Sequence, residues 1–73
     1  MTYEIIQEIK NSCANNQMRD VFFSELEIAD TDVWIHEKES RADAIEREEL
    51  PRGVRYRVFS SGLCTEYTLT QAD

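Results

Sequence analysis

The last third of the chain alternates apolar and polar residues on either side of a turn signal at Ser61-Gly62. A period of two predicts strands with one buried face, and Ser-Gly suits a two-residue hairpin turn. Such a turn sets the register of the two strands. The predicted cross-strand pairs are Val54 with Leu69, Tyr56 with Tyr67, Arg57 with Glu66 and Val58 with Thr65. Every pair is compatible, so this pattern requires an antiparallel hairpin.

A third strand, over residues 43–50, is predicted to precede this hairpin. Pro51-Arg52-Gly53 suits a three-residue loop, since Pro presets φ and Gly accepts the left-handed position. That register sets Leu50 beside Val54 and Ile45 beside Phe59. It also turns Glu46 and Glu48 toward the buried face, so either this is an edge strand whose carboxylates reach solvent, or the register differs.

The N-terminal segment, residues 2–14, is predicted to form an amphipathic helix. Ile5, Ile6, Ile9 and Cys13 fall on one stripe at helical spacing, and Thr2 suits the N-cap. This stripe is expected to face the core.

Two further segments each leave an alternative open. Residues 21–28 favour a strand by their β-branched and aromatic content, although a helix starting at Asn16 also aligns apolar residues. Residues 31–39 favour a short helix capped by Asp30 or Thr31, with Trp34 as its main buried side chain. The rival for this segment is an alternating strand.

These elements predict a single α+β domain over residues 1–73, in which a long N-terminal helix packs on a small antiparallel sheet. The element order is α-β-α-β-β-β, and the last three strands form a meander. A domain of this size buries only about 60% of the surface of its unfolded chain, so its stability is expected to be marginal.

The charge balance bears on partners and location. The chain has 15 acidic and 8 basic side chains, a net charge of −7, which disfavours binding to nucleic acid or to an anionic membrane. We find no apolar stretch long enough to cross a membrane and no signal peptide pattern. Cys13 and Cys64 are far apart and read as reduced thiols in a cytoplasmic protein.

The sequence contains no constellation typical of catalysis or of cofactor binding. His36 is the only histidine, and nothing places a nucleophile beside it. Two isolated cysteines and one histidine do not supply a zinc site. Asp30-Thr31-Asp32 begins like a calcium loop, but Ile35 and Arg41 occupy the positions that require Gly and Glu. We therefore expect a protein without enzymatic activity, metal or cofactor.

One surface stands out as a candidate interaction patch. The predicted register places an apolar row on the outer face of the sheet, beside a charged rim. The row is Ile45, Phe59 and Cys64, and the rim includes Arg55, Arg57 and Glu66. An apolar centre with a charged rim is common in protein interfaces.

The leading hypothesis is a small acidic binding or adaptor module, with an unidentified protein partner or a second copy of itself in a homodimer. The first alternative is an acidic mimic of nucleic acid that inhibits a basic protein. The second is a thiol-dependent redox protein that uses Cys64.

Overall fold

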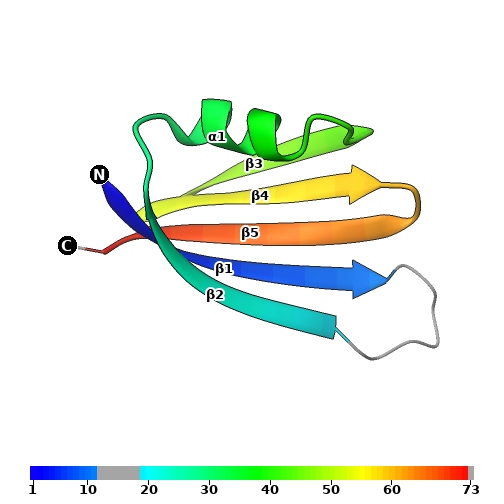
Figure 1. Ribbon diagram of the computed structural model, residues 1–73, viewed down its shortest axis with the longest axis horizontal. Coiled ribbons are helices and arrows are strands. Elements are labelled where there is room, and N and C mark those ends of the chain that lie inside the picture. The colour runs from blue at the N-terminus through cyan, green and yellow to red at the C-terminus, as the bar shows by residue number, and fades with distance from the viewer. Residues whose placement is uncertain (12–18, 73) are drawn as a thin grey trace.

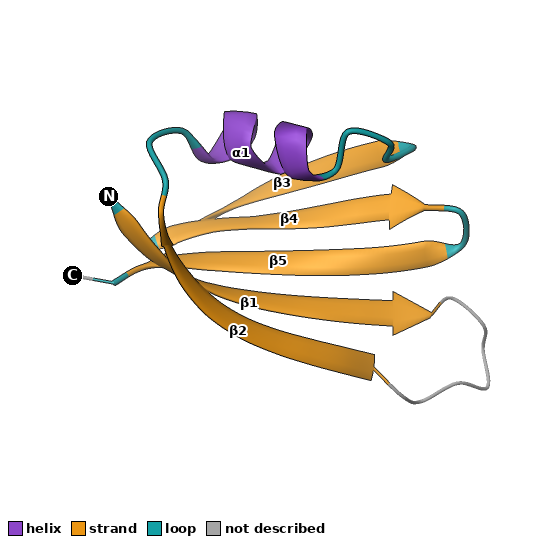
Figure 2. Cartoon of the chain, viewed as in Figure 1, coloured by secondary structure: helices purple, strands orange, loops and turns teal. Residues whose placement is uncertain are grey.

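The computed structural model describes residues 1–11 and 19–72, which form one antiparallel sheet with a helix on one of its faces (Figure 1, Figure 2). The elements in chain order are β1 (Thr2–Asn11), β2 (Arg19–Glu27), α1 (Thr31–Lys38), β3 (Ala44–Leu50), β4 (Gly53–Ser60) and β5 (Leu63–Gln71).

The spatial order of the five strands is β2-β1-β5-β4-β3. The N-terminal strand therefore lies inside the sheet, between β2 and the C-terminal strand, and β2 and β3 form the two edges. Both chain ends lie at the same end of the sheet (Figure 1). We call the side that carries α1 the helix face and the opposite side the open face.

The predicted N-terminal helix over residues 2–14 is wrong, and with it the predicted fold class and the order α-β-α-β-β-β. Residues 2–11 form β1, which pairs with β2 on one side and with β5 on the other. The segment also has a period of two, because Tyr3, Ile5 and Ile9 all lie on the helix face. Pairing with two neighbouring strands outweighs the local helical pattern. Cys13, the last residue of the predicted stripe, lies outside the described residues.

The strand predicted for residues 21–28 and the helix predicted for residues 31–39 are confirmed as β2 and α1. Asp30 caps the helix, because its Oδ1 accepts hydrogen bonds from the backbone N–H groups of Asp32 at 3.0 Å and Val33 at 3.3 Å. These bonds satisfy donors that have no partner within the helix.

The register predicted for the last hairpin is confirmed, with Tyr56 opposite Tyr67 and Arg57 opposite Glu66. Ser61 and Gly62 have φ values of 47° and 82°, both in the left-handed region that this type of tight turn requires. The turn residues and the alternating pattern therefore agree, and the local signal is sufficient to set the pairing.

The register predicted between residues 43–50 and β4 is wrong by one residue. The connection uses only Pro51 and Arg52, so Leu50 pairs with Gly53 and Ile45 pairs with Val58. A shift of one residue moves every side chain to the other face. Ile45 therefore lies on the helix face, and Glu46 and Glu48 lie on the open face.

The core lies between α1 and the helix face of β4 and β5, with Ile5 of β1 beside them. Trp34 of α1 packs edge-on against Tyr67 of β5, with ring centroids 5.8 Å apart. Figure 1 shows α1 running above β3 and β4, away from β2. The buried core residues are Ile5, Ile28, Ile35, Val54, Tyr56, Val58, Tyr67 and Leu69.

Candidate functional site

A polar cluster joins α1 to the sheet. The Tyr56 hydroxyl donates a hydrogen bond to the Asp32 carboxylate and lies 2.9 Å from the Thr31 hydroxyl. Arg47 Nε donates to the same carboxylate at 3.2 Å. The hydrogen bond from Tyr56, together with Arg47, lowers the pKa of Asp32. Each polar group has a partner within the cluster, so the arrangement anchors the helix and offers no free base.

Two buried tyrosines on the helix face make the fold sensitive to alkaline pH. Burial raises the pKa of Tyr56, assisted by Asp32, and burial raises the pKa of Tyr67, assisted by the Glu39 carboxylate. A phenol whose pKa is higher in the folded state stabilises the fold fully below its unfolded pKa, about 10. That stabilisation is lost as pH rises through the folded-state pKa.

We therefore expect the free energy of unfolding to fall as pH rises above about 10. Denaturant unfolding followed by circular dichroism at successive pH values measures this fall. The control is Tyr67→Phe, in which the slope with pH should be smaller. An equal slope in this variant and the natural chain would contradict the assignment to Tyr67.

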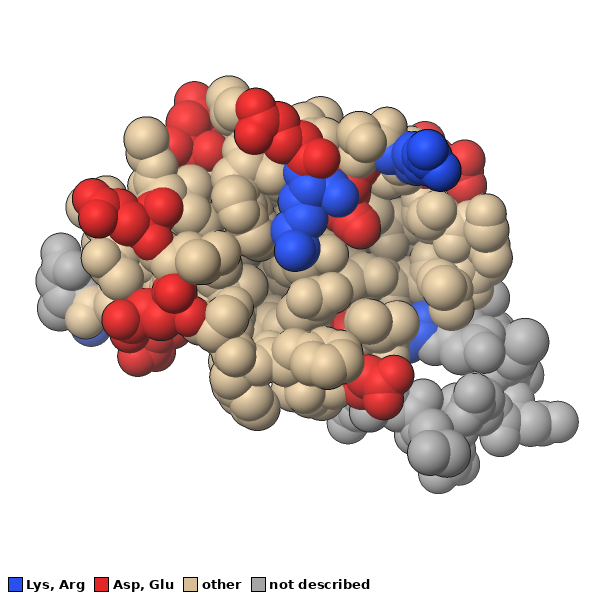
Figure 3. All heavy atoms as spheres, viewed as in Figure 1, with Lys and Arg blue, Asp and Glu red and all other residues tan. Residues whose placement is uncertain are grey.

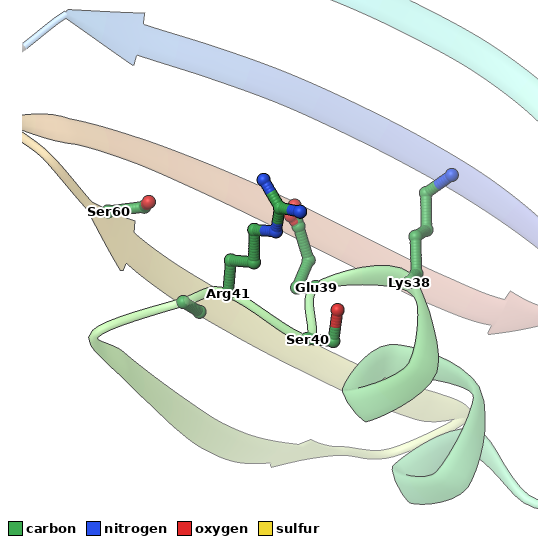
Figure 4. Close-up of a pocket in the computed structure, with 6 residues that line it drawn as sticks. Lys38, Glu39, Ser40, Arg41 and Ser60 are labelled. Carbon is green, nitrogen blue, oxygen red and sulfur yellow. The ribbon is translucent and has the colours of Figure 1, made fainter.

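A shallow pocket lies where α1 ends. It has a volume of about 320 Å³ and is lined by Lys38, Glu39, Ser40, Arg41, Ala42 and Ser60. Figure 4 shows the side chains of Lys38, Glu39 and Arg41 extending to the same side of the turn. The lining mixes both signs of charge and includes two serines, Ser40 and Ser60, but no histidine or cysteine.

The open face carries a ladder of ion pairs across three strands. Glu48 of β3 lies 3.3 Å from Arg55 and 3.5 Å from Arg57. On the other side, Glu66 of β5 lies 3.6 Å from Arg55 and 3.3 Å from Arg57. Both arginines of the predicted rim are thus neutralised by carboxylates on neighbouring strands. Glu49 of β3 lies on the helix face, where it pairs with Arg47 at 2.8 Å.

The structure brings together five of the six residues of the predicted patch. Arg55, Arg57, Phe59, Cys64 and Glu66 all lie on the open face. Ile45 does not, because the register differs and its side chain packs against the core. Ala44 takes its place beside Phe59. The apolar row at this point is therefore smaller than the sequence predicts.

The structure separates the two groups considered for thiol chemistry. Cys64 lies half-buried on the open face, whereas His36 is on α1, which covers the helix face. His36 Nδ1 donates to the backbone carbonyl of Asp32 at 2.7 Å. Lys10, on β1, lies level with Cys64, but its ammonium group pairs with Glu66 at 3.8 Å. The sheet thus stands between the thiol and the imidazole.

The most unusual surface is the edge strand β2. Its exposed apolar side chains, which we call the β2 apolar strip, have exposed fractions of 41% for Val21, 53% for Phe22, 75% for Phe23 and 45% for Leu26. Phe22 and Leu26 lie on the helix face, beyond the reach of α1, and Val21 and Phe23 lie on the open face. In Figure 3 the lower centre of the view, over β1 and β2, is largely uncharged.

Reasoning from the sequence did not identify this strip as a surface. Val21, Phe22 and Phe23 are consecutive, and an apolar run without alternation is typical of a strand buried on both faces. In this chain the run belongs to an edge strand, which nothing in the described residues covers. In the sequence, the strip is marked by the absence of apolar–polar alternation. The order of the strands in the sheet is needed to show that β2 lies at an edge.

Within the described residues, no three His, Cys, Asp or Glu side chains are close enough to hold a metal ion. No helix among residues 1–11 and 19–72 is long and apolar enough to cross a membrane. No protein-family model, curated protein or solved structure matches the chain.

Proposed function

We propose that this protein is a non-catalytic protein-binding module and that it binds through the edge of β2. The observation that carries the proposal is the β2 apolar strip, with Phe23 exposed to 75% on a strand whose outer edge pairs with no other strand in the described part of the chain. An edge strand offers backbone N–H and C=O groups without partners, and exposed apolar side chains add the energy of their burial.

The contrast between the two edges of the sheet supports this proposal. The other edge, β3, carries four consecutive charged residues, Glu46, Arg47, Glu48 and Glu49. Charged side chains along an edge disfavour the addition of another strand. The centre of β2 is uncharged from Val21 to Ser24. One edge is thus protected and the other is suited to pairing.

The charge pattern favours this function over an acidic mimic of nucleic acid. A mimic needs carboxylates in rows that reproduce a phosphate backbone. On the open face, Glu48 and Glu66 alternate with Arg55 and Arg57, and each carboxylate is engaged by both arginines. The carboxylates of this ladder therefore do not form a continuous acidic row.

A photo-crosslinking residue tests the proposed binding edge. We expect p-benzoylphenylalanine in place of Phe23 to form covalent adducts with protein in the native cell. In place of Phe59, which is also an exposed aromatic of the open face, it should form none. Adducts at position 23 should disappear when Val21→Lys is added and persist when Val33→Lys is added. A folded variant with no protein adduct at position 23 would refute the proposal.

A further inference from the structure

We propose that the partner of β2 is a second copy of this chain, paired antiparallel along β2 about a two-fold axis at Phe22. This inference rests on the proposed function, because it assumes that the β2 edge binds protein. It adds the identity of the partner and the register of pairing. The result is a closed dimer with one continuous sheet.

The sequence of β2 is complementary to itself in this register. A two-fold axis perpendicular to the sheet leaves the helix faces of both copies on the same side. Residues that pair across this axis therefore have their side chains on the same face. Phe22 meets the partner's Phe22 on the helix face, and Val21 meets the partner's Phe23 on the open face. Asp20 lies opposite the partner's Ser24. Each of the positions 20–24 thus faces a compatible residue.

Neighbouring registers lack this complementarity. An axis at Phe23 would set Val21 against the partner's Glu25 and Asp20 against the partner's Leu26. An axis at Val21 would set Phe22 against the partner's Asp20. Both place a carboxylate beside an apolar side chain, and the axis at Val21 also separates the aromatic residues. Among these three, only the axis at Phe22 pairs Val21, Phe22 and Phe23 entirely with one another.

The opposite edge explains why assembly would stop at two copies. Pairing along β2 leaves β3 as the outer edge on both sides of the dimer, and β3 is charged at Glu46, Arg47, Glu48 and Glu49. Such an edge does not readily accept another strand. The interface is isologous, so it uses the same surface of both copies and closes on itself. The two-fold axis also keeps both α1 helices on the same face.

Charge supplies a test that separates a second copy from a basic partner. Each copy carries a net charge of −7, so two copies repel each other and salt screens that repulsion. Self-association should therefore strengthen, or stay constant, as salt is added. Binding to a basic protein should weaken with salt. Sedimentation equilibrium of the purified chain at low and high salt measures the first effect.

A matched pair of substitutions tests the interface itself. Phe22 and Val33 are both 53% exposed, but Val33 lies on α1, away from the edge. Sedimentation equilibrium should show a monomer–dimer equilibrium for the natural chain and for Val33→Lys. Phe22→Lys should weaken dimerisation at least about tenfold, a loss of about 1.4 kcal/mol. Circular dichroism confirms that each variant is folded, and Val21→Lys serves as a second interface variant.

Disulfide formation tests the register. With both native cysteines replaced by serine, Phe22→Cys should form a covalent dimer under mild oxidation, because residue 22 lies on the axis. Ser24→Cys should not, since its opposite residue is the partner's Asp20. Efficient crosslinking through residue 24 with none through residue 22 would overturn the register.

The outcomes also separate this inference from the proposed function. A chain that stays monomeric at every concentration and salt level, while p-benzoylphenylalanine at position 23 captures a different protein, refutes the dimer and leaves the binding edge in place. A monomer without any adduct at position 23 refutes both. A dimer that is equally stable in Phe22→Lys and the natural chain refutes this interface.

Discussion

Gly53→Ala should destabilise the fold by about 3 kcal/mol or more, at the upper end of the range for overpacking. An added Cβ at Gly53 would lie 1.8 Å from the backbone carbonyl oxygen of Leu69, which is a severe clash. The obstacle is backbone at the end of the β4–β5 ladder where β4 begins, so it cannot rotate away as a side chain would. Relief requires the two strands to separate where Gly53 pairs with Thr70.

The expected loss is large relative to the whole fold. A chain of 73 residues has a total stability of about 4–11 kcal/mol. Gly53→Ala therefore should remove about a quarter to three quarters of that stability, measurable by denaturant unfolding. The control is Gly62→Ala, in the turn at φ 82°, where we expect only the left-handed backbone cost of about 1–2 kcal/mol. Equal losses for the two variants would contradict the steric explanation.

Ile35→Ala should cost about 2–5 kcal/mol, because it removes the most deeply buried side chain of α1. Ile35 is fully buried and is the only buried residue of that helix. Since the helix is short and covers Tyr56 and Tyr67, its loosening would also expose those rings. We expect lower thermal stability together with increased tyrosine and tryptophan accessibility to a soluble fluorescence quencher.

The matched control for Ile35→Ala is Val33→Ala. Val33 lies on the same helix but is exposed, and alanine has the higher helix propensity, so stability should change by less than about 0.5 kcal/mol. If the two substitutions have the same effect, α1 does not pack on the sheet through Ile35.

The candidate site shows where reasoning from the sequence stopped. The predicted patch combined a correct hairpin, which brings Phe59 and Cys64 together, with a register error that added Ile45. That error arose because Pro51-Arg52-Gly53 suits a three-residue loop, whereas the sheet uses Gly53 as a paired residue of β4. The choice between the two depends on the backbone of β5, which passes too close to Gly53 for any side chain.

The sequence alone determined those elements that depend on residues close together along the chain. The alternation around Ser61-Gly62 set the β4–β5 register, because a two-residue turn allows only one pairing of the strands. The sequence favoured a helix that starts at Asp30 or Thr31, and the structure selects Asp30 as the N-cap, which acts on neighbouring backbone groups.

The tertiary structure decided whatever depends on residues far along the chain. Residues 2–11 fit either a helical stripe or an alternating strand, and the ladders with β2 and β5 select the strand. The exposure of Phe22 and Phe23 was settled in the same way, by the sheet order that places β2 at an edge beyond α1. Burial and pairing depend on neighbours in space. β1 finds one of its two neighbours at the other end of the chain, and the outer edge of β2 has none among residues 1–11 and 19–72.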